Sequence, residues 1–584
     1  MCGIIGIYSE DMNIRKNLKE ALSELSRRGP DDSGTLLRDK CVLGHTRLSI
    51  LDLSGGHQPM KDSKKNIWLS FNGEIYNFLE LRSDLISKGH TFATEGDSEV
   101  ILKAYKEYGE HCVEKLDGMF AFAIWDEEND IFLIARDRFG KKPLYMMNHD
   151  SGIICASEIK ALISLTKKKF TLNATAIDEY LRLMYIPPNM SIYKEINPLL
   201  PAHYMVFSKG DSRTVHYWKL KHNPISVSYA DAKREIKNLL SKAVSKRMVA
   251  DVEIGSLLSG GVDSTLVSIL AHNEIKNKLK TFSVRYGNEI NETPYAKQVS
   301  KKIQSEHFVI DAHNRDIISE LTTILRYLDE PHGDSSLFPQ HIVSELASSK
   351  VKVALSGDGA DEFFMGYGWY TKWNNLPKIK WLKTRLFSNR LREYFSYINI
   401  FSNQERKKLW KKEYAKNIQD DTYTNRTNRD NIKSINDFDI NVYLPGQLLS
   451  KIDSTSMMHG LEIRSPFLDT QLAEYVYNLP TEFKMKGNMN KIILKDILCE
   501  YMPKDFVYRR KQGFGAPTIS WLKNNDVKVR IYEMTKETSH VAKFFDYTYI
   551  KKLADNFYKG ENELHQKLWI ILSLEIWLSI HHPA

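Results

Sequence analysis

The stretch SLLSGGVDST, residues 256–265, decides the fold class of the second half of the chain. It predicts an apolar strand that runs into Ser259, Gly260 and Gly261, followed by a helix that begins near Asp263. Glycines let the backbone approach an anion closely, and the N-terminus of a helix offers free N–H groups and a positive dipole end. Because the lysine of a Walker A motif is missing, we interpret the stretch as a phosphate loop of another type.

A second glycine-rich loop, VALSGDGADEFFMGY (residues 353–367), follows a second apolar strand. Its acids Asp358, Asp361 and Glu362 stand beside a strand end, where a cation would neutralise them, so we expect magnesium. Strands that alternate with helices, such as the helical pattern 230–248 before the first loop, indicate a parallel α/β sheet. Ligands are then expected at the carboxyl ends of the strands.

Three further segments of this half are polar. The loop DEPHGDSSLFP (329–339) is dense in acids and hydroxyls and suits the same site. The loop RRKQGFGAP (509–517) is basic, and its glycines would allow it to close over phosphates. The region 370–440 is rich in lysine, arginine and asparagine with weak periodicity, which predicts a solvated, helical, variable surface.

The first two hundred residues have a different pattern. Short segments alternate apolar and polar residues and are broken by glycine, which is typical of half-buried antiparallel strands. Helical patterns lie between them, so we expect a layered α+β domain. A proline-rich passage, 185–204, marks the change of character, and we expect domains at 1–210 and 211–584. The strand-like segments are 41–50, 67–76, 119–128 and 130–140.

Composition limits the classes of function. The chain of 584 residues is 42% hydrophobic and 27% charged, as in globular proteins, and its net charge of +9 fits an anionic substrate such as a nucleotide. Nucleic-acid binding would need that charge clustered on one element, so we expect no nucleic-acid partner. The most apolar stretch, 568–580, is too short to span a membrane and contains Glu575. We therefore expect a buried C-terminal helix and no membrane partner.

Two features of the sequence bear on where the protein is located. No secretory signal opens the sequence, and the five cysteines lack the CxxC spacing of a zinc site or a disulfide framework. Both observations favour a cytoplasmic protein. The sequence does not determine the oligomeric state, and we expect a homodimer.

Cys2 follows the initiator methionine directly and raises the question of an N-terminal nucleophile. Removal of Met1 is expected because cysteine is small, and it would leave the thiol beside a free α-amine with a reference pKa of about 8. Such an amine can act as general base to the thiol, which could then attack an amide and release ammonia. A strand start at this point is compatible with that chemistry. Suitable substrate-binding residues follow: Arg47 for an α-carboxylate, Glu74 and Asp97 for an α-ammonium, and Asn72 with the backbone of Gly73 for an oxyanion hole.

The sequence resembles a known family over nearly its whole length. The segments MCGIIG, RRGPDDSG, HTRLSI, FNGEIYN, GDSEVIL, LDGMFAFAIWD and RDRFGKKPLY look like a class II glutamine amidotransferase domain. The segments SLLSGGVDS, VALSGDGADE and HGLEIRSPFLD, with the region around Lys491, look like the synthetase domain of glutamine-hydrolysing asparagine synthetases. The resemblance implies an N-terminal αββα glutaminase of the Ntn type and an α/β ATP pyrophosphatase-like domain with additional helices. It also implies that ammonia passes between them through an internal tunnel.

The same resemblance implies a role for each candidate residue. Cys2 would hydrolyse glutamine, bound by the five residues named above, and ATP would activate a carboxylate as an acyl-adenylate. Mg²⁺ is implied at Asp263 and Asp361. Lys491 would stabilise the adenylation transition state, and Asp358 is a candidate base for the attack of ammonia. The residues implied to contact ATP are Leu258, Ser259, Gly260, Gly261, Asp263, Ser264, Val284, Ser356 and Gly357.

Departures from the family pattern fall where the acceptor is chosen. Asp358 stands where well-known members have glutamate, although a large bacterial subgroup shares the aspartate. Lys451 stands in place of an arginine near the substrate, and Ser454 in place of an arginine common in the bacterial subgroup. Arginine and lysine are not interchangeable in bidentate carboxylate binding. We therefore expect aspartate as the acceptor, with another carboxylate, such as a sugar uronate of surface-polysaccharide assembly, as the alternative.

Other classes share only parts of this pattern. Amidophosphoribosyl and sugar-phosphate aminating enzymes have the Cys2 domain but lack the SGGxDS loop. Relatives that form β-lactams keep the ATP loop but need no glutaminase. A non-catalytic protein on this fold would be expected to lose Cys2 or the aspartates of the two loops, and this sequence keeps them.

Overall fold

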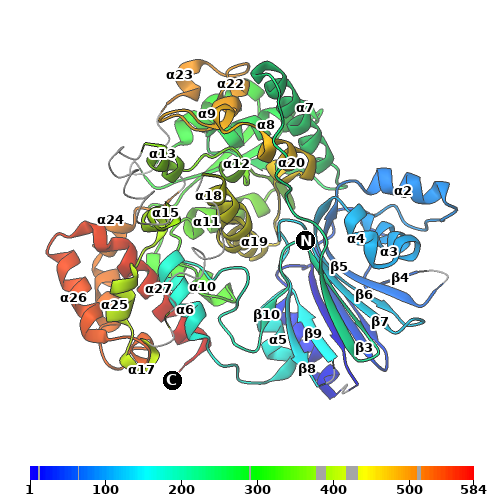
Figure 1. Cartoon of the computed structure of the whole chain (residues 1–584), viewed down its shortest axis with the longest axis horizontal. Coiled ribbons are helices and arrows are strands. Elements are labelled where there is room, and N and C mark those ends of the chain that lie inside the picture. Colours follow the sequence, from blue (N-terminus) through cyan, green and yellow to red (C-terminus); the bar gives the residue numbers. More distant parts are fainter. Residues whose placement is uncertain are drawn as a thin grey trace.

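A computed structural model gives the structure over residues 1–10, 13–62, 65–150, 152–287, 291–375, 390–415, 418, 432–509 and 515–583. The N-terminal half is built on two antiparallel sheets, and the C-terminal half on a parallel sheet surrounded by helices (Figure 1). The predicted phosphate-closing loop 509–517 and the polar region 370–440 both lie partly outside the described residues.

The two antiparallel sheets of the N-terminal half have six strands each. In spatial order the first contains β10 (Asn197–Pro198), β8 (Tyr145–His149), β9 (Gly152–Ala156), β1 (Gly3–Tyr8), β3 (Cys41–Arg47) and β2 (Asp32–Leu37). The second contains β12 (Asp211–His216), β11 (His203–Ser208), β7 (Ile131–Arg136), β6 (Gly118–Asp126), β5 (Ile67–Ile75) and β4 (Met60–Lys61). The four strand-like segments of the sequence correspond to β3, β5, β6 and β7, and this prediction is confirmed.

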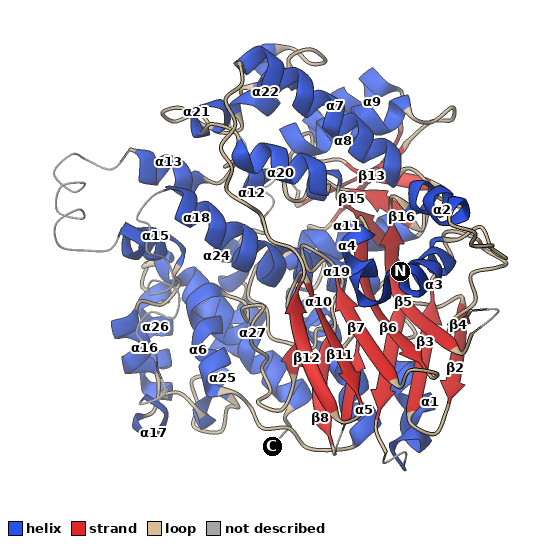
Figure 2. Ribbon diagram, turned by 45° about the vertical axis from the view of Figure 1, so that its right-hand side comes forward, coloured by secondary structure: helices blue, strands red, loops and turns tan. Residues whose placement is uncertain are grey.

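Side chains that alternate along β1 explain how the layers stack. Ile4 packs with Ala123 and Ile134 of the second sheet, whereas its neighbour Ile5 belongs to the core on the other face, with Leu162 of a covering helix. The outer helices are α1 (Leu18–Glu24) and α5 (Ile159–Thr166) on the first sheet, and α2 (Phe78–Ser87), α3 (Asp97–Tyr108) and α4 (Cys112–Lys115) on the second (Figure 2). The order helix, sheet, sheet, helix confirms the αββα architecture.

The last strand of the second sheet lies beyond residue 210. Strand β12 pairs along its length with β11, from Ser208 opposite Asp211 to His203 opposite His216. The boundary expected at 210 falls in the turn between these two strands, so we propose that the N-terminal half ends after His216.

The C-terminal half has a five-stranded parallel sheet. Its order is β15 (Glu306–Asp311), β14 (Lys280–Arg285), β13 (Ile254–Leu257), β16 (Val353–Leu355) and β17 (Glu462–Arg464). Val353 and Leu355 face a core with α7 (Tyr229–Arg247), α8 (Val262–Asn273) and α9 (Thr293–Ile303). Ala354 faces the opposite core with α11 (Leu337–Ser348) and α19 (Ser450–Met457), so helices cover both faces. The predicted parallel α/β sheet is confirmed.

The direction in which successive strands are added to this sheet reverses at its centre. Numbered along the chain, the strands lie in the order 3-2-1-4-5, so the switch point falls between β13 and β16. Ligands of doubly wound sheets bind at this point, beyond the carboxyl ends of the strands. The loops SGGVDS and SGDGAD follow these two strands and therefore lie side by side.

Additional helices complete the C-terminal half. The C-terminal helix α27 (His565–His581) is buried from Leu568 to Leu574 and accepts, at the carbonyl of Ile570, a hydrogen bond of 2.7 Å from Tyr180 in α6 (Ala174–Leu183). The predicted buried terminal helix is confirmed. Over the described residues, no helix combines the length and apolar character needed to cross a bilayer. Other helices of this half are α12 (Ala360–Phe363), α18 (Ile432–Phe438), α20 (Thr470–Asn478) and α22 (Ile492–Leu498).

Candidate active sites

The candidate glutamine site lies where strand β1 begins, in the middle of the first sheet. A cavity of about 40 Å³ is lined by Cys2 with Arg47, Gly73, Glu74 and Asp97. Cys2 directly precedes β1, and the others come from β3, β5 and the first turn of α3. The structure therefore brings together five of the six residues expected from the sequence.

Asn72, the remaining member of the expected set, is outside this lining, but its side-chain amide lies next to Cys2. Its Oδ1 accepts a hydrogen bond of 3.0 Å from the backbone N–H of Cys2. Its Nδ2 is buried and has no hydrogen-bond partner in the protein. A buried donor without a partner is costly, so this atom is suited to a ligand oxygen such as a developing oxyanion.

The charged residues of the cavity are held firmly. Arg47 donates to the backbone carbonyls of Leu51 and Asp52, at 3.2 and 2.6 Å. Asp97 accepts a hydrogen bond of 2.9 Å from the N–H of Ile75, and burial raises the pKa of its carboxyl to about 6. Burial also raises the pKa of the Cys2 thiol, so the thiol is neutral.

Glu74 has a partner that the sequence did not indicate. Arg464, at the end of β17 in the other half, donates to Glu74 at 2.7 Å and to Glu462 at 2.7 Å. Burial raises the pKa of Glu74, and Arg464 opposes that rise. Although HGLEIRSPFLD was noted in the sequence, nothing in it showed that Arg464 reaches the glutamine pocket.

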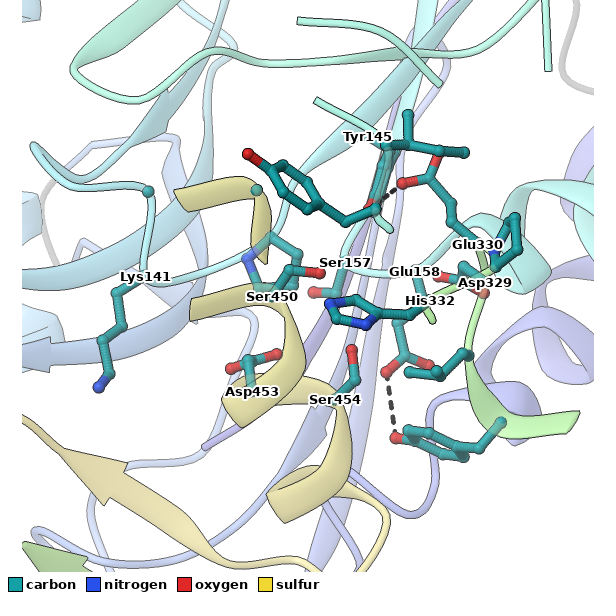
Figure 3. Close-up of a pocket in the computed structure, with 18 of the residues that line it drawn as sticks. Lys141, Tyr145, Ser157, Glu158, Asp329, Glu330, His332, Ser450, Asp453 and Ser454 are labelled. Carbon is teal, nitrogen blue, oxygen red and sulfur yellow. Dashed lines mark hydrogen bonds between the residues drawn. The ribbon is translucent and has the colours of Figure 1, made fainter. Parts of the chain in front are cut away.

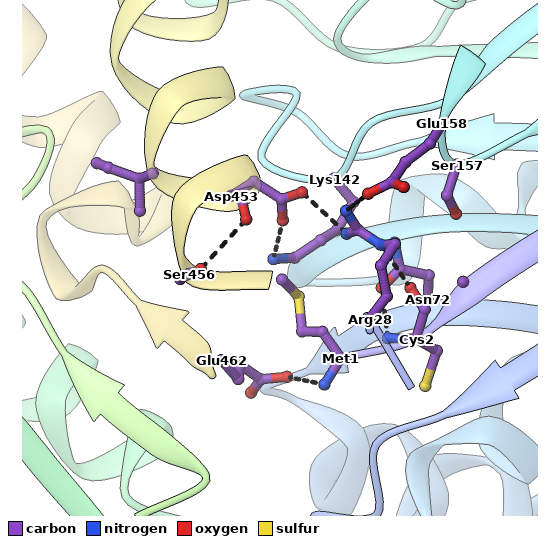
Figure 4. Close-up of polar contacts among 12 residues, drawn as sticks. Met1, Cys2, Arg28, Asn72, Lys142, Ser157, Glu158, Asp453, Ser456 and Glu462 are labelled. Carbon is purple, nitrogen blue, oxygen red and sulfur yellow. Dashed lines mark hydrogen bonds and ion pairs between the residues drawn. The ribbon is translucent and has the colours of Figure 1, made fainter. Parts of the chain in front are cut away.

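Met1 fills the space between the two halves (Figure 4). Its ammonium group lies 3.3 Å from Oε2 of Glu462, and its side chain packs with Tyr76, Met119 and Met457. Burial lowers the pKa of this ammonium group. While Met1 is present, Cys2 has a peptide N–H in place of the free amine that the predicted chemistry requires.

The candidate ATP site is a cavity of about 570 Å³ at the switch point of the parallel sheet. It is lined by eight of the nine residues expected at ATP and by three of the expected catalytic and metal residues; Gly260 and Lys491 are outside this lining. The lining members of the set are Leu258, Ser259, Gly261, Asp263, Ser264, Val284, Ser356, Gly357, Asp358 and Asp361.

The phosphate loop has the geometry that its glycines require. Gly260 has φ +78°, and a Cβ on it would lie 2.7 Å from the backbone N of Ala296, so only glycine fits. The hydroxyls of Ser259 and Ser264 lie 3.0 Å apart, at the N-terminus of α8. Free N–H groups and two hydroxyls thus face the cavity where phosphates would bind.

Lys491 joins the two predicted metal ligands. Its Nζ lies 2.7 Å from Oδ2 of Asp263 and 2.6 Å from Oδ1 of Asp361. The other carboxylate oxygen of Asp263, Oδ1, is buried without a hydrogen-bond partner and so fits a cation. Within the described ranges, no group of three or more His, Cys, Asp or Glu residues has a metal-binding arrangement.

Lys451 also lines the ATP cavity, and it follows an unusual helical segment. The segment Asp439–Leu449 is a π-helix that runs into α19, and π-helical segments are frequent at functional sites. Lys451 lies 2.9 Å from Oδ2 of Asp334 and 2.6 Å from Oγ of Ser336. Gln447 lies one turn earlier, and its Oε1 is buried without a hydrogen-bond partner.

The other face of the same helix lines a smaller cavity of about 50 Å³ between the two halves (Figure 3). Ser450 and Ser454 contribute small side chains from this helix. Arg28 of the N-terminal half joins Glu158, at 2.9 Å, to Asp453 of the C-terminal half, at 2.8 Å. The remaining polar lining is Arg136, Lys141, Tyr145, Ser157, Tyr185, Tyr327, Asp329, Glu330 and His332.

Comparisons with known proteins match both halves. The family model "Glutamine amidotransferase domain" matches residues 1–218, and "Asparagine synthase" matches residues 235–579. Glutamine-hydrolyzing asparagine synthetase 1 of Bacillus subtilis is 29% identical, with 100% of this chain and 97% of that protein covered. Asparagine synthetase 3 of the same organism is 31% identical over 88% of this chain and 87% of that protein. A putative asparagine synthetase 2 of Methanocaldococcus jannaschii is 37% identical over 63% of this chain and 76% of that protein.

Proposed function

Since the chain belongs to the asparagine synthase family and carries a glutamine amidotransferase domain, we propose that it transfers the amide nitrogen of glutamine to aspartate, with ATP cleaved to AMP and pyrophosphate. The observation that carries the proposal is the pairing of two sites in one molecule. A thiol pocket with an unpartnered amide donor lies in one half, and a phosphate-loop cavity lies in the other. A third cavity, lined by residues of both halves, lies between them.

In the first site, removal of Met1 gives Cys2 a free α-amine that takes the proton of its thiol. The sulfur attacks the amide carbon of glutamine, and the oxyanion accepts hydrogen bonds from Nδ2 of Asn72 and the N–H of Gly73. Collapse of this intermediate breaks the C–N bond, returns the proton to the nitrogen and leaves a thioester. The unpartnered Nδ2 of Asn72 supports this assignment.

In the second site, an oxygen of the β-carboxylate of aspartate attacks the α-phosphorus of ATP, and pyrophosphate leaves. Lys491, held between Asp263 and Asp361, places a cation at the phosphate loop and neutralises the charge that develops on the phosphates. The carboxylates of Asp263 and Asp361 would also hold Mg²⁺, which supplies positive charge to the phosphates when bound. The product of this step is a β-aspartyl-adenylate.

Ammonia then reaches the adenylate from the cavity between the halves and displaces AMP. This cavity and the ATP cavity are lined by opposite faces of the helical segment 439–457, so the two are neighbours. A buried route keeps ammonia unprotonated and keeps water from the adenylate.

The polar groups around Lys451 support an amino-acid acceptor. An amino acid presents one carboxylate and one ammonium group beside the carboxylate that reacts. Lys451 and the hydroxyl of Ser336 are donors for the carboxylate, and the unpartnered Oε1 of Gln447 is an acceptor for the ammonium. Asp334 shares Lys451, so an acceptor must compete for this cation or bind beside it.

A panel of acceptors tests the proposal. The enzyme is incubated with ATP, glutamine and one of aspartate, glutamate or glucuronate, and AMP and the amide product are measured. We expect AMP and asparagine with aspartate and neither product with the other two. AMP with glucuronate alone would instead assign a sugar acid as the acceptor. Lys451→Met should raise the KM for aspartate about tenfold or more while the KM for ATP is unchanged.

A further inference from the structure

One lysine of the N-terminal half points toward the synthetase site. Lys141 lies in the loop between β7 and β8, and only 6% of its surface is exposed. Asp137 fixes this loop, because its carboxylate accepts hydrogen bonds from the N–H groups of Lys141 and Lys142, both at 2.9 Å. Arg136 adds hydrogen bonds to the carbonyls of Lys142 and Gly140. The loop is therefore a rigid support that delivers the lysine to the interface.

The ammonium of Lys141 donates a hydrogen bond to Oγ of Ser465, directly after strand β17 of the other half. In Figure 3 its side chain points away from the acids Asp329 and Glu330 of the cavity between the halves. The next lysine behaves differently, because Lys142 pairs with Asp453 at 3.2 Å. Two adjacent buried lysines thus have separate partners.

A chain of hydroxyls continues from Ser465 into the ATP cavity. Oγ of Ser465 lies 3.2 Å from Oγ of Ser356, and Ser356 donates to Oδ2 of Asp358 at 2.5 Å. Since the lysine can only donate, the hydroxyl of Ser465 is free to donate onward to Ser356. Every hydrogen bond in the chain then points toward the carboxylate and favours its ionised form.

We infer that Lys141 is a positioning residue, which acts through two serines to hold Asp358 as a carboxylate, so that the docked glutaminase half completes the synthetase site. The inference rests on the proposed function, in which Asp358 receives a proton. Ammonia forms a C–N bond to the carbonyl carbon of the adenylate, and its proton passes to Asp358. The C–O bond to AMP then breaks, and AMP leaves with the electron pair.

The charges around both groups agree with this role. Burial raises the pKa of Asp358, and among its charged neighbours Lys141 opposes that rise most, followed by Lys451, while Asp263 adds to it. Burial lowers the pKa of Lys141 to about 8, opposed by Asp358 and Asp453 and reinforced by Lys142 and Arg247. Removal of the lysine therefore leaves Asp358 less ionised at neutral pH.

The test measures ammonia-dependent amide synthesis of the whole enzyme against pH. The quantity of interest is the rate ratio of Lys141→Met to wild type, in which the ionisation of free ammonia cancels. We expect a ratio that is lowest at pH 6 and rises with pH, by about tenfold for each unit by which the pKa of Asp358 has increased. Glutamine hydrolysis and ATP–pyrophosphate exchange should be unchanged, because they precede the step that needs this base.

Matched variants separate this role from simple support of the fold. Lys142→Met removes a buried lysine of the same loop and should give a ratio that does not fall toward pH 6. Ser465→Ala interrupts the series of hydrogen bonds with a smaller change and should reproduce the pH dependence of Lys141→Met. If Lys141→Met does not fold, Ser465→Ala provides the test. A flat ratio for both overturns the inference while wild type still forms the amide. A wild type that forms no amide refutes the proposed function as well.

Discussion

Nη2 of Arg464 lies 2.7 Å from Oε2 of Glu74 and so joins the ATP-binding half to the glutamine pocket. The same residue accepts, at its backbone carbonyl, a hydrogen bond of 2.9 Å from the N–H of Ser356 in the second nucleotide loop. Strand β17, three residues long, therefore contacts both candidate sites. A buried ion pair thus joins the two halves.

Replacing Arg464 should destabilise the molecule strongly. Arg464→Met leaves Glu74 and Glu462 buried without their common cation, and loss of one partner from a buried ion pair typically lowers the free energy of unfolding by about 3–5 kcal/mol. Urea titration measures this change. Arg285→Met, which removes an exposed pair with Asp311, is the control and should cost about 0–1 kcal/mol. Equal effects of the two variants would contradict the structural account.

Asn72→Ala should affect catalysis by the glutaminase and leave glutamine binding largely intact. Because the variant loses the proposed oxyanion donor, we expect kcat for glutamine hydrolysis to fall about 10²- to 10³-fold with little change in KM. Asn77→Ala, five residues later and bonded to Lys115 and Asp117, should keep the wild-type kcat. A rise in KM alone would mean that Asn72 binds glutamine without stabilising the oxyanion.

Lys491→Met should abolish adenylation while glutamine hydrolysis continues. The variant removes the cation between Asp263 and Asp361, and their unbalanced charge repels phosphates. Aspartate-dependent exchange of labelled pyrophosphate into ATP measures this step. Nζ of Lys495, one helical turn along α22, lies 3.4 Å from Oδ1 of Asn490 instead. Lys495→Met is therefore the control and should retain exchange. Exchange that survives in Lys491→Met would place the essential cation elsewhere.

Glutamine binding should weaken in acid. Burial raises the pKa of Asp97 to about 6, and only its ionised form attracts the α-ammonium of glutamine. As pH falls through about 6, Asp97 is protonated, and the KM for glutamine should rise about tenfold per pH unit below that value. Asp97→Asn should have a high KM that no longer changes over this range. A wild-type KM that is constant from pH 5 to 7 would contradict the assignment.

Local sequence signals predicted most of the fold and the first contacts of both sites. Alternating residues gave the antiparallel strands, because each such strand has one face in a core. Glycine-rich turns between strand and helix gave the two nucleotide loops, because the chain requires φ values such as the +78° of Gly260. Those features depend on neighbours in the chain, so a single sequence carries them.

Contacts between the halves could not be predicted in this way. Arg28, Lys141 and Arg464 are charged residues that a single sequence assigns to the surface, and each is buried because its partner comes from a distant segment. Strand β12 was missed for a related reason. Its residues Asp211–Thr214 are exposed, so the edge strand lacks the apolar alternation that marks the others.

The proposed function requires this chain to carry nitrogen from glutamine to aspartate at the expense of ATP. The most direct test supplies amide-¹⁵N-glutamine, ATP and aspartate together with unlabelled ammonium, and analyses the product by mass spectrometry. We predict asparagine with ¹⁵N in its amide and one AMP for each molecule formed. The Cys2→Ala variant should form only unlabelled asparagine from the added ammonium. Wild-type enzyme that forms no asparagine, or only the unlabelled product, would contradict the account.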